Sequence, residues 1–429
     1  MRKVVIVGLA KSGIEAARLL ASRKDTVFIT ELKNDAAAME SRDLLIKECV
    51  IEPENIELGA HTDKFIKKAN LMVVSPGVRR DALPVKLAEA KKIPVISELE
   101  LAYKMCPASA PIIAVTGTSG KTTTTTLIGR MLKASGLDAI VCGNIGNPFS
   151  GEIKKINKDS IVVLEVSSFQ LELIDKFKPR VSIILNISDN HLDRHKDMNE
   201  YITAKCRVFL KQDKKDILFL NKNDWRLREI ASVVKGPKVQ FFNEYKGFRA
   251  RHNILNDDYL AAMSAASIMA VDEERMLEVI ENFKGIEHRL EHVANVEDVD
   301  FINDSKATTI SSVEWALKSL GGNTILIVGG KYKGGDFGLL KDLVEAKVDY
   351  IISIGEARPQ IKNGLDGIKP IFEANSFSQA VSEGFKRAKK GGRVLLSPGC
   401  SSFDMFENYE ERGKIFKDIV KEIASRSLH

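Results

Sequence analysis

The segment AVTGTSGKTTTTTLIG, from Ala114 to Gly129, joins an apolar run to a glycine-flanked lysine and a row of threonines. Glycines let backbone N–H groups face phosphate oxygens, and the start of a helix favours negative charge. The common phosphate loop G-x-x-x-x-G-K-[ST] has its first glycine where this chain has Val115. A phosphate-binding loop is still favoured over a plain glycine turn, because a turn needs neither Lys121 nor the hydroxyl of Thr122.

Short apolar runs rich in β-branched residues alternate with helical stretches along the whole chain. Continuous runs closed by Gly, Ser or Asn are typical of strands buried on both faces of a parallel sheet. The pattern therefore predicts an α/β fold throughout. The predicted strands are KVVIVG, TVFIT, LMVVSPG, PVIS, PIIAVTG, SIVVLEV, VSIILN, DILFLN, NTILIVGG, YIISIG and RVLLSPG.

The length of 429 residues indicates about three domains. Two breaks suggest the boundaries: CPASAP at 106–111, with two prolines, and FKGIEHR at 283–289, which follows a long helical stretch. We predict domains at 1–106, 107–285 and 286–429.

The charges are balanced along the chain, with 64 basic and 58 acidic residues and a net charge of +6. This mixture argues against a nucleic-acid or membrane surface. The apolar N-terminal run is interrupted by Lys11 and Glu15, so it predicts a buried strand and not a signal peptide. We expect a soluble intracellular protein with reduced thiols, because the odd set of cysteines is widely spaced. The cysteines are Cys49, Cys106, Cys142, Cys206 and Cys400.

Glu165 interrupts the apolar run IVVLEV near the carboxyl end of a predicted strand, where α/β sheets bind ligands. A carboxylate at such a place is costly unless it is paired or binds a metal. Two interpretations are open: a magnesium ligand of a nucleotide site, or a structural acid with a partner.

The segment NISDNHLDRH carries His191, Asp193 and His195. A zinc site is one interpretation, but the i, i+2, i+4 spacing in a loop is not that of a helical ligand pair. We favour one histidine assisting a magnesium ion near a triphosphate, and we expect His195 to be a solvated loop residue.

The segment EYITAKCRVF has a helical apolar stripe in which Lys205 shares a face with Tyr201, Ala204, Val208 and Phe209. In one interpretation the ammonium group reaches past its neighbours into solvent. In the other, desolvation lowers the pKa of Lys205 and the neutral amine reacts with CO₂ to form a carbamate, a carboxylate-like metal ligand. The spacing does not decide between the two.

Two further glycine-containing segments are candidate binding loops. GLAKSG resembles the dinucleotide fingerprint, but Ala10 stands at the second glycine and hinders close approach to a pyrophosphate. A tight turn without ligand is the alternative. GGKYKGGDF presents Lys331 and Lys333, which suit either an acidic ligand or a solvated loop.

The motifs in their order resemble the Mur ligase family, and within it the members that add D-glutamate. The resemblance covers essentially the whole chain and implies a Rossmann-like N-terminal domain, a P-loop ATPase domain with a mainly parallel sheet, and a Rossmann-like C-terminal domain. The family's ATP loop is GT-x-GK-[ST], which explains the missing glycine at Val115. The motifs are GTSGKTT, EVSSFQLE, NISDNHLDRH, AKCRVF, RHNILN, EHRLE, INDSKATT and LLSPGCSSFDMFENYEERG.

The resemblance implies that ATP phosphorylates the alanine carboxylate of UDP-N-acetylmuramoyl-L-alanine. The amine of D-glutamate then attacks the acyl phosphate through a tetrahedral intermediate, giving an amide, ADP and phosphate. The implied cofactors are ATP, two Mg²⁺ ions and a CO₂-derived carbamate on Lys205. The resemblance further implies a monomeric bacterial cytoplasmic enzyme of peptidoglycan synthesis, and hence a role in cell shape and division.

The resemblance also implies roles for individual residues. The ATP-binding set is Gly117, Thr118, Ser119, Gly120, Lys121, Thr122, Thr123, Asn253, Asn256, Arg289 and Asp304. The catalytic set is Lys121, Glu165, His191 and Lys205, and the metal set is Thr122, Glu165, His191 and Lys205. The UDP-substrate set is Lys11, Ser12, Glu31, Gly77 and Asn144. The D-glutamate set is Thr308, Lys333 (or its neighbour Lys331), Ser402 and Tyr409.

Two other functions compete with this one. A sister ligase adding a different amino acid would share most of the motifs. A non-catalytic nucleotide-binding protein on the same scaffold is the second alternative, but it has no use for a complete set of Glu165, His191, Lys205 and Asp304.

Overall fold

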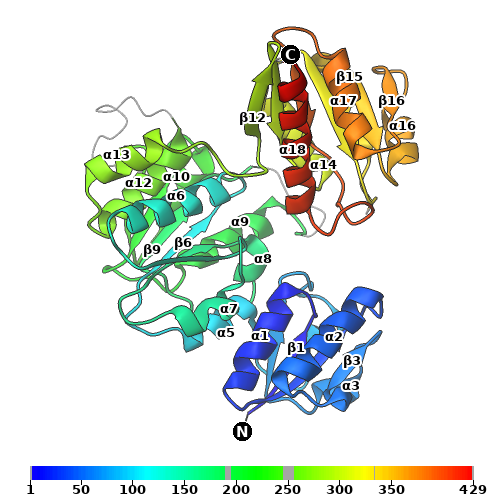
Figure 1. The fold of residues 1–429 in the computed structure, drawn as a ribbon. Coiled ribbons are helices and arrows are strands. Elements are labelled where there is room, and N and C mark those ends of the chain that lie inside the picture. Colours follow the sequence, from blue (N-terminus) through cyan, green and yellow to red (C-terminus); the bar gives the residue numbers. More distant parts are fainter. Residues whose placement is uncertain (1, 189–194, 245–255, 333, 428–429) are drawn as a thin grey trace. The chain divides into compact units, whose positions relative to one another are not determined.

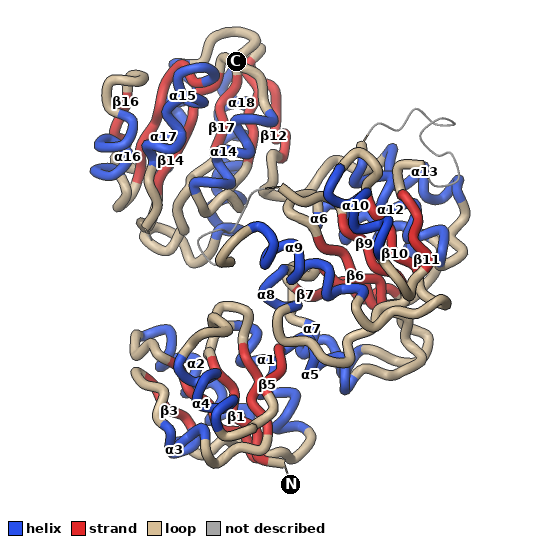
Figure 2. Tube along the Cα trace, turned by 180° about the vertical axis from the view of Figure 1, so that it is seen from behind, coloured by secondary structure: helices blue, strands red, loops and turns tan. Residues whose placement is uncertain are grey.

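The structure is a computed structural model that describes residues 2–188, 195–244, 256–332 and 334–427. The chain forms two compact units, Met1–Asn282 and Phe283–His429. The first unit holds two sheets and the second holds one, each with helices packed against it (Figures 1 and 2). The predicted α/β class with largely parallel sheets is confirmed.

The N-terminal sheet is fully parallel, with the order β3-β2-β1-β4-β5. All residues of β1 except Lys3 are buried, which confirms that the apolar N-terminus is a core strand. The strands are β1 (Lys3–Val7), β2 (Thr26–Glu31), β3 (Ile56–Leu58), β4 (Leu71–Val74) and β5 (Val95–Ser97). The helices are α1 (Lys11–Ser22), α2 (Ala36–Cys49), α3 (Asp63–Ile66), α4 (Leu83–Ala90) and α5 (Glu98–Met105), with a 3₁₀ turn at Pro53–Asn55.

The central sheet is also parallel, with the order β11-β10-β9-β6-β8-β7. The chain leaves β6 toward one edge and later continues toward the other, so β6 lies at the topological switch point where such sheets bind ligands. The strands are β6 (Ile112–Thr116), β7 (Ala139–Gly143), β8 (Ile161–Glu165), β9 (Val181–Ile184), β10 (Ile217–Leu220) and β11 (Lys238–Phe241). The helices are α6 (Lys121–Ala134), α7 (Phe149–Glu152), α8 (Ser168–Leu171), α9 (Met198–Cys206), α10 (Trp225–Val233), α12 (Asp257–Ile268) and α13 (Glu273–Glu281), with 3₁₀ turns at Ile153–Lys155 and Arg207–Phe209.

The C-terminal sheet is mixed, with the order β12-β13-β17-β14-β15-β16, because β12 runs antiparallel to β13. The strands are β12 (Glu291–Val296), β13 (Val299–Asn303), β14 (Thr324–Gly329), β15 (Val348–Ile354), β16 (Ile371–Glu373) and β17 (Arg393–Leu396). The helices are α14 (Ile310–Ser319), α15 (Lys341–Lys347), α16 (Arg358–Leu365), α17 (Phe377–Arg387) and α18 (Tyr409–Ser427), with a 3₁₀ turn at Phe337–Leu340.

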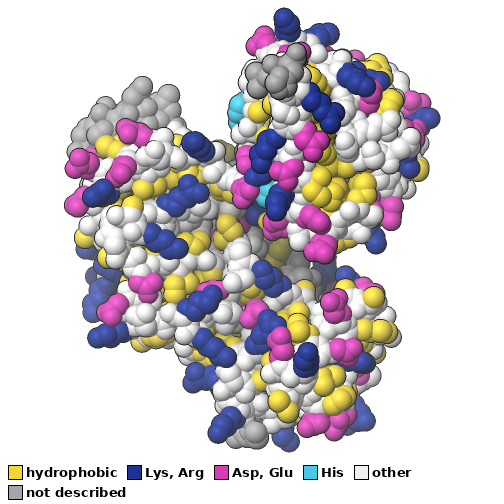
Figure 3. All heavy atoms as spheres, in the orientation of Figure 1, with side chains coloured by type: hydrophobic (Ala, Val, Ile, Leu, Met, Phe, Trp, Pro, Cys, Tyr) yellow, Lys and Arg dark blue, Asp and Glu magenta, His cyan; other side chains and the backbone are white. Residues whose placement is uncertain are grey.

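The mixed surface charge and the free cysteines agree with what the composition predicts. On the face shown in Figure 3, basic and acidic side chains are interspersed. All five cysteines are free thiols. Among the described residues, no helix combines the length and the apolar character that a membrane crossing requires.

One buried carboxylate joins α5 to the turn that precedes β9. Glu100 is 0% exposed, and its side chain accepts hydrogen bonds from the backbone N–H groups of Asp175, Lys176 and Phe177 at 3.0, 2.8 and 3.0 Å. This carboxylate satisfies backbone donors that no sheet or helix satisfies, and therefore holds the turn in place.

Glu100→Gln should lower the free energy of unfolding by about 1–3 kcal/mol, because the amide turns an N–H₂ group toward backbone donors and leaves buried groups unpaired. Denaturation in urea, followed by circular dichroism, measures the change. The exposed Glu89→Gln in α4 is the matched control and should have no effect. Equal stability of the two variants would contradict the anchoring role.

Candidate nucleotide and ligase site

The phosphate loop follows β6 directly and ends where α6 begins at Lys121. Gly117 and Gly120 have φ of +148° and +78°, a backbone conformation that favours glycine. Asn186, which follows β9, accepts hydrogen bonds through Oδ1 from the backbone N–H groups of Thr118 and Ser119, at 3.1 and 2.9 Å. Sequence reasoning missed this residue, although it closes a strand in the motif NISDNH. Asn186 braces the loop from the neighbouring strand.

The ammonium group of Lys121 lies over the carbonyl side of this loop. Its Nζ donates to the backbone oxygens of Gly117 and Thr118, at 3.1 and 2.9 Å. The loop therefore combines a cation, glycine backbone and a helix start at one place, which is an arrangement that binds phosphate.

Three of the predicted residues meet at the carboxylate of Glu165, at the end of β8. Thr122 Oγ1 donates to Glu165 Oε2 and Asn144 Nδ2 donates to Oε1, both at 2.7 Å. Glu165 and Thr122 are only 2% and 3% exposed. The carboxylate thus has neutral partners on both oxygens, and it retains lone pairs that could face a cation.

Lys205 lies in α9, and its side chain is 2% exposed, so the interpretation in which it reaches solvent is wrong. Its Nζ donates to the backbone oxygen of Gly117 at 2.8 Å and lies 4.4 Å from the ring centre of Tyr201. Burial, and secondarily the charge of Lys121, hold the pKa of the Lys205 amine well below its usual range. The predicted desolvation is confirmed, and it favours a neutral, reactive amine.

The expectation for His195 is wrong. This side chain is buried, its Nε2 lies 3.0 Å from Ser168 Oγ, and its ring stacks on Phe169 with centres 5.3 Å apart. A second ring, that of Tyr201, packs beside it. The histidine therefore fills the space between α8 and α9, a contact that the local sequence does not encode.

Four predicted residues lie outside the described part of the chain: His191, Asp193, Asn253 and Lys333. Of the adenine-side residues, Asn256 caps α12, where its Oδ1 accepts from the backbone N–H of Asp258 at 2.9 Å. Among the described residues, no group of three or more His, Cys, Asp and Glu side chains is arranged to hold a metal.

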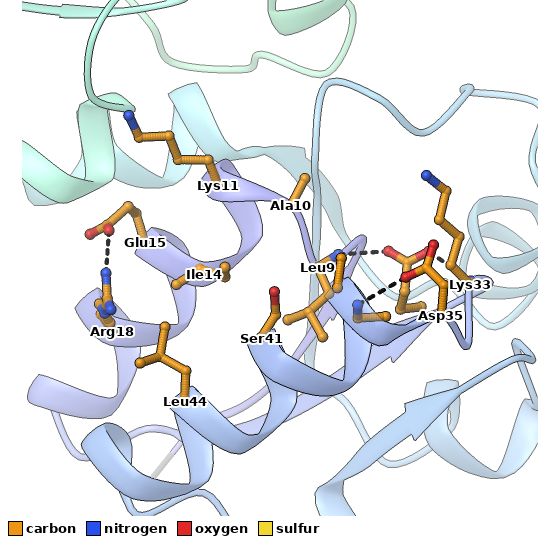
Figure 4. A pocket seen from close by; sticks show the side chains of 13 residues that line it. Leu9, Ala10, Lys11, Ile14, Glu15, Arg18, Lys33, Asp35, Ser41 and Leu44 are labelled. Carbon is orange, nitrogen blue, oxygen red and sulfur yellow. Dashed lines mark hydrogen bonds and ion pairs between the residues drawn. The ribbon is translucent and has the colours of Figure 1, made fainter. Parts of the chain in front are cut away.

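The N-terminal sheet carries a cavity of about 440 Å³ at the β1–α1 turn, shown in Figure 4. Lys11 and Glu31 line it, whereas Ser12 and Gly77 do not. Lys11 Nζ donates to the backbone oxygen of Gly146 at 2.8 Å, and Glu31 accepts from the backbone N–H of Leu9 at 2.8 Å. Further lining side chains combine apolar surface with two more cations: Ile14, Leu44, Arg18 and Lys33.

In the second unit, Asp304 lies just after β13 and is 5% exposed. Ser397 Oγ donates to its Oδ2 at 2.8 Å and the backbone N–H of Leu290 to its Oδ1 at 3.3 Å. Burial raises the pKa of Asp304 to about 7, and the hydrogen bonds from Ser397 and Leu290, and then the charge of Arg289, oppose this shift. A carboxyl group whose pKa lies near neutral pH is typical of a functional site.

The candidate amino-acid residues lie on loops that meet near the end of β14. Lys331 N donates to Ser401 O at 2.9 Å, which joins the GGK segment to the loop that carries buried Ser402. Tyr409 begins α18 and packs edge-on against His288, with ring centres 6.3 Å apart. Thr308 lies just before α14 and is partly exposed.

Sequence reasoning missed Arg412, which is 1% exposed. Its guanidinium donates to Ser305 O at 2.7 Å and to Cys400 O at 3.2 Å, so it joins two loops of the candidate amino-acid site. Burial lowers its pKa to about 10. The signal was present, because Arg412, Phe416 and Val420 form a buried stripe of α18.

The parallel sheets and the glycine loop between β6 and α6 define an α/β protein with the arrangement of a phosphate-binding loop. Comparison with known families specifies the class: residues 2–97 match the Mur ligase MurD-like N-terminal domain, 115–290 the Mur ligase middle domain, and 288–400 the Mur ligase glutamate ligase domain. The chain belongs to the Mur ligase family.

Individual relatives support this assignment over the full length. The UDP-N-acetylmuramoylalanine–D-glutamate ligases of Geotalea uraniireducens and Geobacter sp. are 39% and 37% identical, covering 98% of this chain and 98% and 97% of theirs. Among solved structures, Thermotoga maritima UDP-N-acetylmuramate–alanine ligase MurC matches with TM-score 0.56 and 16% identity, covering 98% of this chain and 100% of that one. MurF ligase of the same organism, solved with ADP, matches with TM-score 0.57 and 15% identity, covering 84% and 92%.

Lys121→Ala should reduce phosphate release from ATP by about two to three powers of ten or more, because a preorganised cation at the phosphates is lost. The variant should remain folded, since the hydrogen bonds from Lys121 to Gly117 and Thr118 stay within its own loop and alanine is a good helix former at the start of α6. Steady-state phosphate release and circular dichroism make the two measurements. Near-normal turnover of a folded Lys121→Ala protein would show that this loop is not the ATP site.

Proposed function

We propose that this protein is an ATP-dependent ligase that adds D-glutamate to UDP-N-acetylmuramoyl-L-alanine in the synthesis of the peptidoglycan precursor. The observation that carries the proposal is the full-length similarity to D-glutamate ligases at 37–39% identity. The geometry around the phosphate loop supports it, because Lys121, Thr122 and Glu165 converge at the switch point of the sheet.

In the proposed reaction, the γ-phosphoryl group of ATP passes to the alanine carboxylate, and ADP leaves. The amine of D-glutamate attacks the acyl phosphate, and the tetrahedral intermediate expels phosphate to leave the amide. Phosphoryl transfer depends chiefly on positioning and on charge stabilisation. Lys121 orients and neutralises the phosphates, and the braced glycine loop supplies backbone donors.

The residues present fit a magnesium ion. Thr122 Oγ1 and Glu165 Oε2 lie 2.7 Å apart, and hydroxyl and carboxylate oxygens are hard donors of the kind that Mg²⁺ prefers. We propose that these two residues, with His191 and carbamylated Lys205, hold two Mg²⁺ ions. When bound, the ions neutralise the negative charge that develops on the phosphoryl oxygens.

We assign further roles by similarity to the family. Asn253 and Asn256 serve the adenine side of ATP, and Arg289 and Asp304 serve its phosphates and ribose. The UDP-substrate is served by Lys11, Ser12, Glu31, Gly77 and Asn144, and D-glutamate by Thr308, Lys333, Ser402 and Tyr409. The domains at 1–106, 107–285 and 286–429 then bind the UDP-substrate, ATP and the amino acid. We also propose a monomer in the bacterial cytoplasm.

Lys205→Ala should be nearly inactive, and millimolar acetate should restore part of the activity by supplying a carboxylate in the space left behind. The proposal that Lys205 is carbamylated rests on its burial and its lowered pKa, because both favour the neutral amine that reacts with CO₂. Phosphate release with and without acetate tests it, and ¹³CO₂ labelling detects the adduct. Full activity of Lys205→Ala, or no label in the active protein, would disprove it.

D-glutamate should be the preferred acceptor, and L-glutamate, D-glutamine and L-lysine should be poor. A site that completes charge-assisted hydrogen bonds to a carboxylate rejects an analogue without that group by up to about 10⁴-fold, because its own donors are left unpaired. The assay supplies each amino acid separately with ATP and UDP-N-acetylmuramoyl-L-alanine and follows the amide product.

Lys333→Ala should chiefly raise the KM for D-glutamate and leave ATP binding unchanged. The same measurement on Lys331→Ala shows which of the two neighbouring lysines binds the amino acid.

In the assay with different amino acids, better turnover with L-lysine would identify a sister ligase. No turnover with any amino acid, despite nucleotide binding, would favour a non-catalytic nucleotide-binding protein.

A further inference from the structure

Asp258 lies in the first turn of α12, and its carboxylate packs against Gly120 at the end of the phosphate loop. A Cβ atom added to Gly120 would lie 2.0 Å from Asp258 Oδ1 and 2.6 Å from Cγ, so only glycine fits beside this side chain. Thr124 Oγ1 also donates to the backbone oxygen of Asp258, at 3.4 Å. The carboxylate is therefore held beside the start of α6.

This carboxylate is poorly stabilised. No hydrogen bond from the described residues reaches it, whereas the neighbouring carboxylate of Asp257 accepts from Asn221 Nδ2 at 2.9 Å. Burial, and then the charge of Asp257, raise the pKa of Asp258 to about 6, and Lys121 opposes the shift. Within the described chain, Asp257 of its own helix and Lys121 of α6 are the charged groups that act on it; α13 and β10, which also pack on α12, add none.

A partly buried carboxylate that receives no hydrogen bond from the described residues and lies next to a second carboxylate is costly to the folded state. Such costs are concentrated at functional sites. The nearest functional feature is the positive field of the loop, which the α6 N-terminus and Lys121 create and which attracts phosphate. Asp258 opposes that field from the side of Gly120.

We propose that Asp258 sets the nucleotide affinity of the phosphate loop: its negative charge opposes the bound phosphates, and nucleotide binding is coupled to the uptake of a proton from solvent by this carboxyl group. The inference rests on the proposed ATP site and deepens it. The consequence for catalysis is that ADP, which must leave after every turnover, is held less tightly than the loop alone would hold it.

The direction of the pH effect follows from the pKa. Above about pH 6 the carboxyl group is ionised and weakens nucleotide binding. Below that pH it is protonated, and the affinity of the wild-type protein should approach that of a variant without the charge.

The test is isothermal titration calorimetry of the full chain with ADP and Mg²⁺. At pH 7.5, Asp258→Asn and Asp258→Ala should each bind ADP about 3- to 10-fold more tightly than wild type, the size expected for removing one like charge about a nanometre or less from the phosphates. Glu274→Gln, an exposed carboxylate in the first turn of the neighbouring helix α13, is the matched control and should bind as wild type does.

A second readout separates the charge from a purely structural effect. At pH 6.5, titrations in PIPES and in Bis-Tris, which differ in ionisation enthalpy, report the protons taken up per ADP bound. The terminal phosphate of ADP titrates in the same range in every variant, so the difference from wild type isolates Asp258. Wild type should take up more protons than either Asp258 variant.

Unchanged or weaker ADP binding by both variants would overturn the inference, as would tighter binding by Asp258→Asn alone, since that would indicate a new amide hydrogen bond. Equal proton uptake by all variants would overturn it too. Lys121→Ala separates this failure from failure of the proposed function: if it still binds ADP as wild type does, the nucleotide assignment of the loop is wrong. If it loses ADP while the Asp258 variants match wild type, the Asp258 inference alone fails.

Discussion

The buried carboxylate of Glu165 is the constraint around which the central site is arranged. A negative charge at 2% exposure must be hydrogen-bonded or neutralised. Thr122 donates from the first turn of α6, and Asn144 donates from the loop after β7. Because β6, β8 and β7 are adjacent in the sheet, one carboxylate joins the carboxyl ends of three neighbouring strands. The phosphate loop therefore has a fixed neighbour that can face a cation.

The backbone oxygen of Gly117 is a second convergence point, because the amines of Lys121 and Lys205 both donate to it. Two like charges in a desolvated region disfavour each other, and the pKa of Lys205 is lowered in part for this reason. Asp258 adds a carboxylate beside Gly120 of the same loop. The surroundings of Lys205 and Asp258 thus disfavour the charged form of each side chain, and groups perturbed in this way are common at functional sites.

Most strands that the sequence predicted lie inside the sheets, whereas most strands that it did not predict lie at the sheet edges. All eleven apolar runs form strands. Six strands were not predicted: five of the six sheet edges, which are β3, β7, β11, β12 and β16, and the internal strand β13, whose apolar run is interrupted by Asp300. Central strands of a parallel sheet are covered on both faces, so their sequences are continuously apolar. Edge strands are short or partly exposed, and their pairing depends on a neighbour that is distant in sequence.

The same distinction separates the site residues that were predictable from those that were not. Local patterns were enough to find the glycine loop and Lys121, because their motif is contiguous in the chain. They were also enough to find Glu165 and Lys205, because each interrupts the apolar pattern of its own strand or helix. They did not indicate that His195 would be buried, that Asn186 would hydrogen-bond to the loop, or that the carboxylate of Asp258 would pack against Gly120. Those outcomes depend on burial and partners supplied by segments far away in the chain, and only the packing of the strands and helices brings such segments together.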